Sequence, residues 1–125
     1  MATKTKVKLS DFVASFIEKS GVKTIFAISG GASLHLIHSI SENSELSVVC
    51  TSHEQGAAMA ADGYSRSTGN IGVAIATSGP GATNLITGIC CSFYDSVPLL
   101  VITGQVSTFR MTGSLGVRQI GFQET

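Results

Sequence analysis

The chain has 125 residues, of which 43% are hydrophobic and 13% are charged, so it carries more apolar material than a disordered chain could keep in water. Eight basic residues balance eight acidic ones, and this balance offers no basic patch of the kind that binds nucleic acid. The longest apolar run, residues 97–102, is far shorter than the roughly 20 residues that span a bilayer, so we expect no membrane partner.

The length suits one domain with one hydrophobic core. The first residues have no apolar signal segment, and we therefore expect a cytoplasmic protein. The three cysteines, Cys50, Cys90 and Cys91, are an odd number, and two of them are adjacent, which disulfide geometry does not readily bridge. We expect reduced thiols that pack in the core.

Helical and extended patterns alternate along the chain. Apolar residues at helical spacing predict a helix over residues 11–20, with Gly21 as its left-handed stop. Short β-branched and aromatic runs predict strands, and further helices lie between them. In chain order these elements are a strand over 22–28, a helix over 32–40, a strand over 46–51, a helix over 54–68, a strand over 71–77, a helix over 82–94 and a strand over 99–103.

This order of elements predicts an α/β fold with an open, mostly parallel sheet flanked by helices on both faces. Residues 71–76 and 99–102 are apolar at nearly every position, so these two strands should be central. The glycine-rich turns at 29–31 and 78–81 both follow strands, which places them at the carboxyl edge where such sheets bind ligands. After residue 103 the pattern becomes a polar loop, and we expect the chain to be the front part of a longer protein.

Several common motifs are incomplete. The turn at 79–84 begins like a dinucleotide fingerprint, but Asn84 stands in place of the third glycine, and no lysine is present for a P-loop. A zinc protease helix would need a histidine at position 57, which is Ala57. His35 and His38 lie one helical turn apart without further ligands, so we expect them to face solvent. A tight turn without any ligand remains an alternative for residues 78–81.

Glu54 is the least ordinary of the polar residues. It begins a predicted helix of small residues and has no charged neighbour until Asp62, which predicts a carboxylate largely shielded from water. A carboxylate at a helix N-terminus also interacts favourably with the helix dipole, and such acids are common. The residues alone leave both interpretations of Glu54 open.

Taken together, several segments resemble the N-terminal pyrimidine-binding domain of thiamine-diphosphate-dependent enzymes, and among these they are most similar to acetolactate (acetohydroxyacid) synthases. The segments are 29–32 (SGGA), 53–66 (HEQGAAMAADGYSR), 76–85 (ATSGPGATNL), 95–106 and 121–124. They follow the family's order and cover nearly the whole chain from residue 9 onward. The resemblance implies that residues 1–125 are this domain in incomplete form, without the central and diphosphate-binding domains.

The resemblance also implies roles for individual residues. Glu54 would be the catalytic carboxylate that hydrogen-bonds N1′ of the cofactor's aminopyrimidine and promotes removal of the thiazolium C2 proton. The other implied cofactor-binding residues are Ser78, Gly79, Pro80, Gly81 and Asn84. The residues implied to border the substrate cavity are Gly30, Gly31, Ala32, Phe122 and Gln123. No metal ligand is implied in this chain, because family members hold Mg²⁺ and the diphosphate with another domain.

The implied activity is decarboxylation of a 2-oxoacid such as pyruvate and transfer of the acyl-anion unit to a second carbonyl compound. The implied assembly is a homo-oligomer whose subunits share the site. Residues 107–120 form a longer segment than in ordinary synthases and resemble synthase-like proteins of surface-sugar pathways. A surface-sugar carboligase, a 2-oxoacid decarboxylase and a separately encoded cofactor-binding subunit, inactive alone, are therefore alternatives. FAD binding also stays open, because other domains mainly hold that cofactor.

Overall fold

The structure is a computed structural model, and it describes residues 6–111. Its centre is one parallel sheet of four strands in the order β2-β1-β3-β4. These strands are β1 (Thr24–Ala27), β2 (Ser47–Cys50), β3 (Gly72–Ala76) and β4 (Leu99–Thr103). All three strand pairs are parallel, so the carboxyl ends of the strands meet at one edge of the sheet. This arrangement confirms the predicted parallel sheet.

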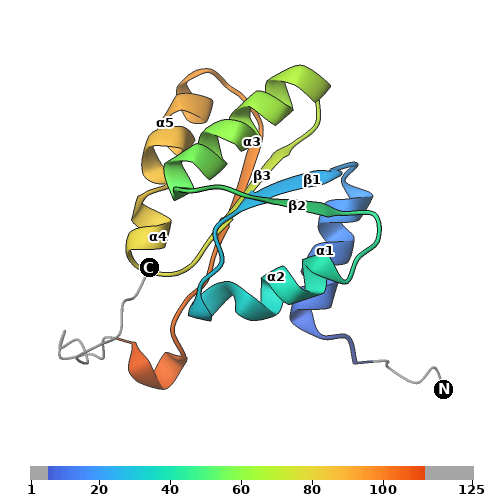
Figure 1. Cartoon of the computed structure of the whole chain (residues 1–125), viewed down its shortest axis with the longest axis vertical. Helices are drawn as coiled ribbons and strands as arrows, with labels where there is room; N and C mark the ends of the chain where they lie inside the picture. Colours follow the sequence, from blue (N-terminus) through green and yellow to red (C-terminus); the bar gives the residue numbers. More distant parts are fainter. Residues whose placement is uncertain (1–5, 112–125) are drawn as a thin grey trace.

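Helices cover both faces of this sheet (Figure 1). The elements on one face are α1 (Leu9–Lys19) and α2 (Leu34–Ser41), and those on the other are α3 (Glu54–Thr68), α4 (Pro80–Thr83) and α5 (Ile86–Tyr94). Side chains alternate along each strand, so Val73 and Ile75 pack with α1 and α2, while Ala74 packs with α3. The α/β class with helices on both faces is confirmed. None of the helices described is long and apolar enough to span a membrane.

Several predicted boundaries are reproduced and others are corrected. The helix over 54–68 and the strand over 99–103 have the predicted bounds. The predicted helix over 82–94 is wrong as one element, because the chain forms α4 and α5 with a tighter turn between them. At this turn the Leu85 N–H donates to the Ala82 carbonyl, three residues back, at 3.1 Å. The predicted helix over 32–40 likewise begins as a 3₁₀ helix, η1 (Gly31–Ser33), before α2.

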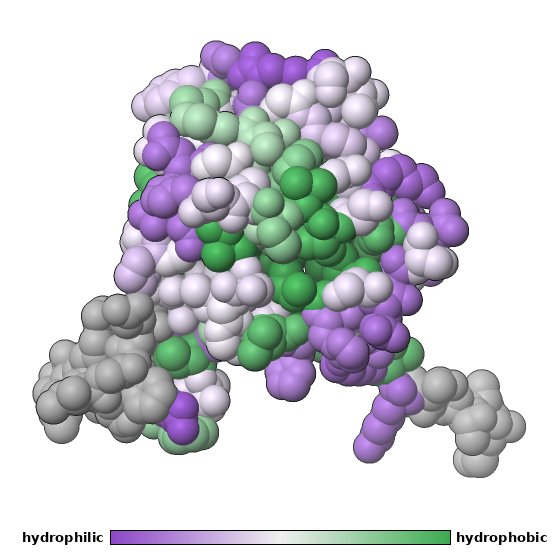
Figure 2. Space-filling view, in the orientation of Figure 1, coloured by the Kyte–Doolittle hydropathy of each residue, from purple (hydrophilic) through white to green (hydrophobic). Residues whose placement is uncertain are grey.

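The two strands expected at the centre of the sheet have different positions. β3 is central and fully buried, as predicted. The central position predicted for β4 is wrong, because within residues 6–111 it pairs with β3 alone and lies at the sheet's edge, half-buried. The opposite edge is β2, whose Val49 is 43% exposed. Figure 2 shows an apolar patch in the middle of the face on which β2 runs in Figure 1.

The cysteines do not pack in the core, so this part of the prediction is wrong. Cys50, Cys90 and Cys91 are all exposed free thiols. The reason on α5 is geometric, because this helix packs through the small residues Gly88 and Ser92, which lie four positions apart on one face. The cysteine positions between them turn away from that face.

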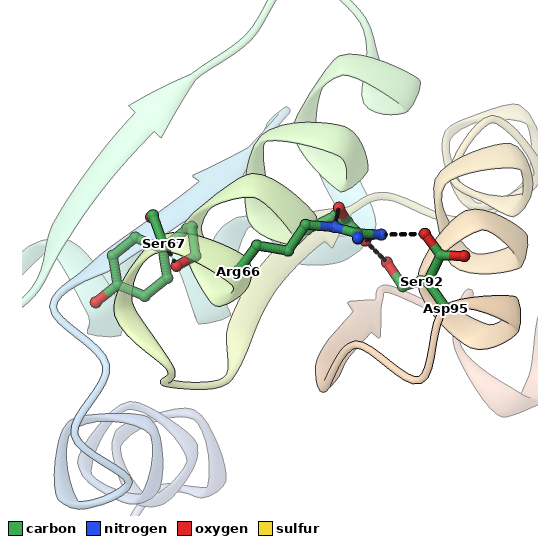
Figure 3. Close-up of polar contacts among 6 residues, drawn as sticks. Arg66, Ser67, Ser92 and Asp95 are labelled. Atoms are coloured by element: carbon green, nitrogen blue, oxygen red, sulfur yellow. Dashed lines mark hydrogen bonds and ion pairs between the residues drawn. The ribbon is translucent and has the colours of Figure 1, made fainter.

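A charged network joins α3 to α5 on the same side of the sheet (Figure 3). Arg66 donates to Asp62 one helical turn before it, at 2.6 Å, and also to Asp95 just after α5, at 2.6 Å. The buried hydroxyl of Ser92 donates to the second carboxylate oxygen of Asp62 at 2.6 Å. The hydrogen bond from Arg66, followed by that from Ser92, lowers the pKa of Asp62 below its ordinary value of 3.8. The network therefore ties the two helices together in the ionised state of Asp62.

Replacing Asp62 with asparagine is expected to lower the free energy of unfolding by about 1–3 kcal/mol at neutral pH, because charged hydrogen bonds to Arg66 and Ser92 are lost. The pKa of Asp62 is lower in the folded protein than its unfolded value of 3.8, so its charged interactions contribute fully to stability at pH values above 3.8. This contribution is lost as the pH falls through the folded-state pKa. Denaturant unfolding of both proteins across this range should show their difference shrinking on acidification. A constant difference would contradict the assignment.

Candidate functional site

Glu54 is the first residue of α3 and follows the carboxyl end of β2. His53 before it is extended and caps the helix, because its Nδ1 accepts a hydrogen bond from the Gln55 N–H at 3.2 Å. This cap fixes the direction in which α3 starts and thus the position of Glu54. The Glu54 side chain is half-buried, which is less shielding than the sequence predicted.

The turn after β3 has a shape that its residues impose. Gly79 has a φ of 66° and a ψ of −127°, a conformation that L side chains rarely adopt. Pro80 follows at the first position of α4, where its missing N–H costs no helical hydrogen bond. The Thr83 N–H then donates to the Gly79 carbonyl at 3.1 Å and closes the turn. A rigid turn therefore precedes Asn84.

The structure brings this turn and Glu54 together. The side-chain amide of Asn84 donates to Oε2 of Glu54 at 3.0 Å. The other carboxylate oxygen, Oε1, lies 3.4 Å from the position that a Cβ on Gly81 would occupy. The same Cβ would lie 2.9 Å from Cγ2 of Thr77, so the backbone at Gly81 packs directly on that threonine and leaves no room for a side chain. The arrangement fixes the Glu54 carboxylate, with Oε2 bound by Asn84 and Oε1 beside the backbone of the glycine turn.

The first glycine-rich turn reaches the same place from β1. A Cβ on Gly30 would overlap the side chain of Thr77, so the backbone at Gly30 packs directly on that threonine. The Ser33 hydroxyl accepts from the Gly30 N–H at 3.2 Å and holds the turn in place. Sequence reasoning did not single out Thr77 as a site residue. Its place directly between a buried strand and the glycine turn was the available signal.

The residues implied to border the substrate cavity do not all lie beside Glu54. Gly30 contacts Thr77, whereas no neighbour lies within 4 Å of a Cβ built on Gly31. Ala32 lines a mostly apolar pocket of about 520 Å³ on the α1 and α2 side, together with residues such as Leu36 and Ile102. Phe122 and Gln123 lie outside the described residues.

Ionisable groups are sparse around this site. Within residues 6–111, no group of three or more histidine, cysteine, aspartate or glutamate residues is placed to hold a metal ion. His35 and His38 of α2 are exposed, as predicted. Glu54 is the acid beside the second glycine turn, and Thr77 lies between that turn and the first one.

Comparisons with known proteins agree with this geometry. Residues 7–124 match the family model described as thiamine pyrophosphate enzyme, N-terminal TPP binding domain. The chain is 47% identical over 118 residues to an acetolactate synthase, chloroplastic, of Arabidopsis thaliana, which covers 94% of this chain and 17% of that relative. It is 52% identical over 93 residues to an acetolactate synthase of Arthrospira platensis, covering 72% of this chain and 16% of the relative.

The chain is also 44% identical over 118 residues to an acetolactate synthase 1, chloroplastic, of Zea mays. This match covers 94% of this chain and 18% of that relative. The chain thus spans less than a fifth of the length of these curated relatives. The family match covers most of the chain, includes both glycine turns and includes Glu54. The chain therefore belongs to the thiamine pyrophosphate enzymes, as their N-terminal TPP-binding domain, and is similar to acetolactate synthases.

Proposed function

We propose that Glu54 is the catalytic carboxylate of this domain and binds the aminopyrimidine of thiamine diphosphate through a ring nitrogen. The observation that carries the proposal is the position of the Glu54 carboxylate at the glycine turn, where Asn84 donates to Oε2 and Oε1 lies 3.4 Å from the Cβ position of Gly81. Ser78, Gly79, Pro80, Gly81 and Asn84 form the remaining cofactor-binding turn. The rigid conformation of Gly79 and Pro80 supports this role, because a preformed turn binds a ligand at little entropic cost.

The residues present fit a proton transfer, because Asn84 and the glycine turn hold the Glu54 carboxylate in place. When bound, thiamine diphosphate supplies a thiazolium that stabilises the carbanion left when a 2-oxoacid loses carbon dioxide. Glu54 holds or moves a proton at the ring nitrogen, which is general acid–base chemistry by a positioned carboxylate. Thr77 and Gly30 pack against each other beside the turn and support its position.

The intact protein, in this proposal, decarboxylates a 2-oxoacid such as pyruvate and transfers the acyl unit to a second carbonyl compound. The similarity to acetolactate synthases supports this reaction. In this proposal Mg²⁺ and the diphosphate are held by a domain outside these residues, and a bound FAD would lie with other domains as well. The protein is proposed to work as a cytoplasmic homo-oligomer. Three exposed apolar side chains of α5, Ile86, Phe93 and Tyr94, support a subunit contact there.

The intact protein, supplied with pyruvate, thiamine diphosphate and Mg²⁺, is expected to release carbon dioxide and form acetolactate. Colorimetric detection of acetolactate, with carbon dioxide measured in parallel, tests this expectation. Carbon dioxide with free acetaldehyde would instead identify a simple decarboxylase. Product formation only with an added ketosugar would identify a surface-sugar carboligase. No carbon dioxide from any 2-oxoacid would contradict the proposed function.

A further inference from the structure

We infer that Asn84 is a positioning residue that decides which oxygen of Glu54 carries the proton. The contact is the hydrogen bond from the Asn84 side-chain amide to Oε2 of Glu54, at 3.0 Å. The inference concerns the contact between two residues of this chain, and its consequence for the cofactor rests on the proposed function.

Both ends of this hydrogen bond are fixed by their backbones. Asn84 lies between α4 and α5, and its own N–H donates to the Pro80 carbonyl at 2.9 Å. The neighbouring Leu85 is fully buried against α3 and the sheet, which anchors the junction. Glu54 starts a helix whose first turn His53 caps. The bond therefore joins two rigid elements 30 residues apart in the chain.

The chemistry of the two groups gives the bond its consequence. The nitrogen of a side-chain amide donates hydrogen bonds and does not accept them. Oε2 of Glu54 is therefore the acceptor, and because the carbonyl oxygen of a protonated carboxyl group accepts better than its hydroxyl oxygen, this bond favours a proton on Oε1. Oε1 is the oxygen beside the glycine turn, 3.4 Å from the Cβ position of Gly81. Asn84 thus favours Oε1 as the oxygen that exchanges a proton with the ring nitrogen in the proposed function.

Without the Asn84 amide, nothing in this contact would favour one oxygen of Glu54 over the other as the proton carrier. With alanine at position 84, the carboxyl group can rotate and place its proton on either oxygen. With aspartate, the side chain keeps nearly the same shape but offers acceptor oxygens and a second negative charge beside Glu54. Misplacing a catalytic group, or removing the partner that orients it, typically costs about 10- to 100-fold.

The test is a double-mutant cycle in the intact protein saturated with thiamine diphosphate and Mg²⁺, with Glu54→Gln, Asn84→Ala and the double variant. The readout is exchange of the cofactor C2 proton with deuterated water, measured by NMR after an acid quench. Asn84→Ala is expected to slow exchange about 10- to 100-fold when Glu54 is present and to have little effect when Gln occupies position 54. Asn84→Asp carries the same expectation and replaces Asn84→Ala in the cycle if that variant does not fold.

A second readout needs no turnover. Calorimetric dissociation constants for thiamine diphosphate should rise severalfold on Asn84→Ala, again only in the presence of Glu54. Asn70→Ala removes an exposed asparagine just after α3, outside the proposed site, and is expected to change neither quantity. This variant controls for the loss of an asparagine side chain as such.

The possible failures can be told apart. Equal effects of Asn84→Ala in both backgrounds would mean that Asn84 acts on the cofactor without Glu54, and this would overturn the inference. Unchanged exchange and affinity in Asn84→Ala, with strong loss in Glu54→Gln, would also overturn the inference but leave the proposed function intact. Unchanged exchange in Glu54→Gln would refute the proposed function itself.

Discussion

Replacing Glu54 with glutamine is expected to slow C2-proton exchange of the bound cofactor by about 10²- to 10⁴-fold, the usual loss when one positioned acid or base is removed. Glutamine has nearly the same size and can still hydrogen-bond a ring nitrogen. It cannot supply or accept the proton that the carboxyl group holds at Oε1. The cofactor should still bind, because its diphosphate is proposed to be held by another domain.

A matched substitution separates this role from a general effect of charge. Glu42→Gln removes an exposed carboxylate at the end of α2, away from the glycine turns, and should leave exchange unchanged. The exchange rate, read by NMR of the quenched cofactor, does not depend on which acceptor the enzyme uses. If the Glu54→Gln variant exchanged the C2 proton at the original rate, Glu54 would be an ordinary acid at a helix N-terminus that only interacts favourably with the helix dipole.

The elements predicted most accurately from the sequence are those in which local signals agree. The helix from Glu54 to Thr68 has small residues on one face, an acid in its first turn and Gly69 in the left-handed conformation after its end. β3 is apolar throughout and lies in the middle of the sheet, where helices cover both its faces. The convergence of the two glycine turns followed from parallel topology, because all strands end at the same edge.

The features that the sequence did not predict depend on contacts across the fold. The break between α4 and α5 depends on how Leu85 is buried and Asn84 is directed toward Glu54, which no local pattern encodes. The apolar character of β4 indicated a central strand, but position in a sheet depends on which strands pair. Cysteine is usually buried, yet on α5 the packed face is formed by Gly88 and Ser92, and the thiols face outward. Thr77 belongs to the site because Gly30 and Gly81, on two different turns, both pack against its side chain.

The close packing of α3 on the sheet leads to the largest expected effect on stability. Gly72 begins β3, and a Cβ built there would overlap the carbonyl oxygen of Ala61 in α3. Gly72→Ala is therefore expected to lower the free energy of unfolding by about 1–3 kcal/mol or more, because helix and strand must move apart. Thermal unfolding and limited proteolysis of the intact protein would measure the loss.

Gly63 is the matched control, since it lies exposed in the same helix and a Cβ there meets no atom within 4 Å. Gly63→Ala is expected to raise stability by roughly 0.5–1 kcal/mol, because alanine favours the helix more than glycine does. Ala61→Gly should not rescue Gly72→Ala, because the overlap is with the backbone oxygen of residue 61 and its side chain is not the obstacle. A stable Gly72→Ala protein, or rescue by Ala61→Gly, would show that α3 does not lie as close to β3 as the structure places it.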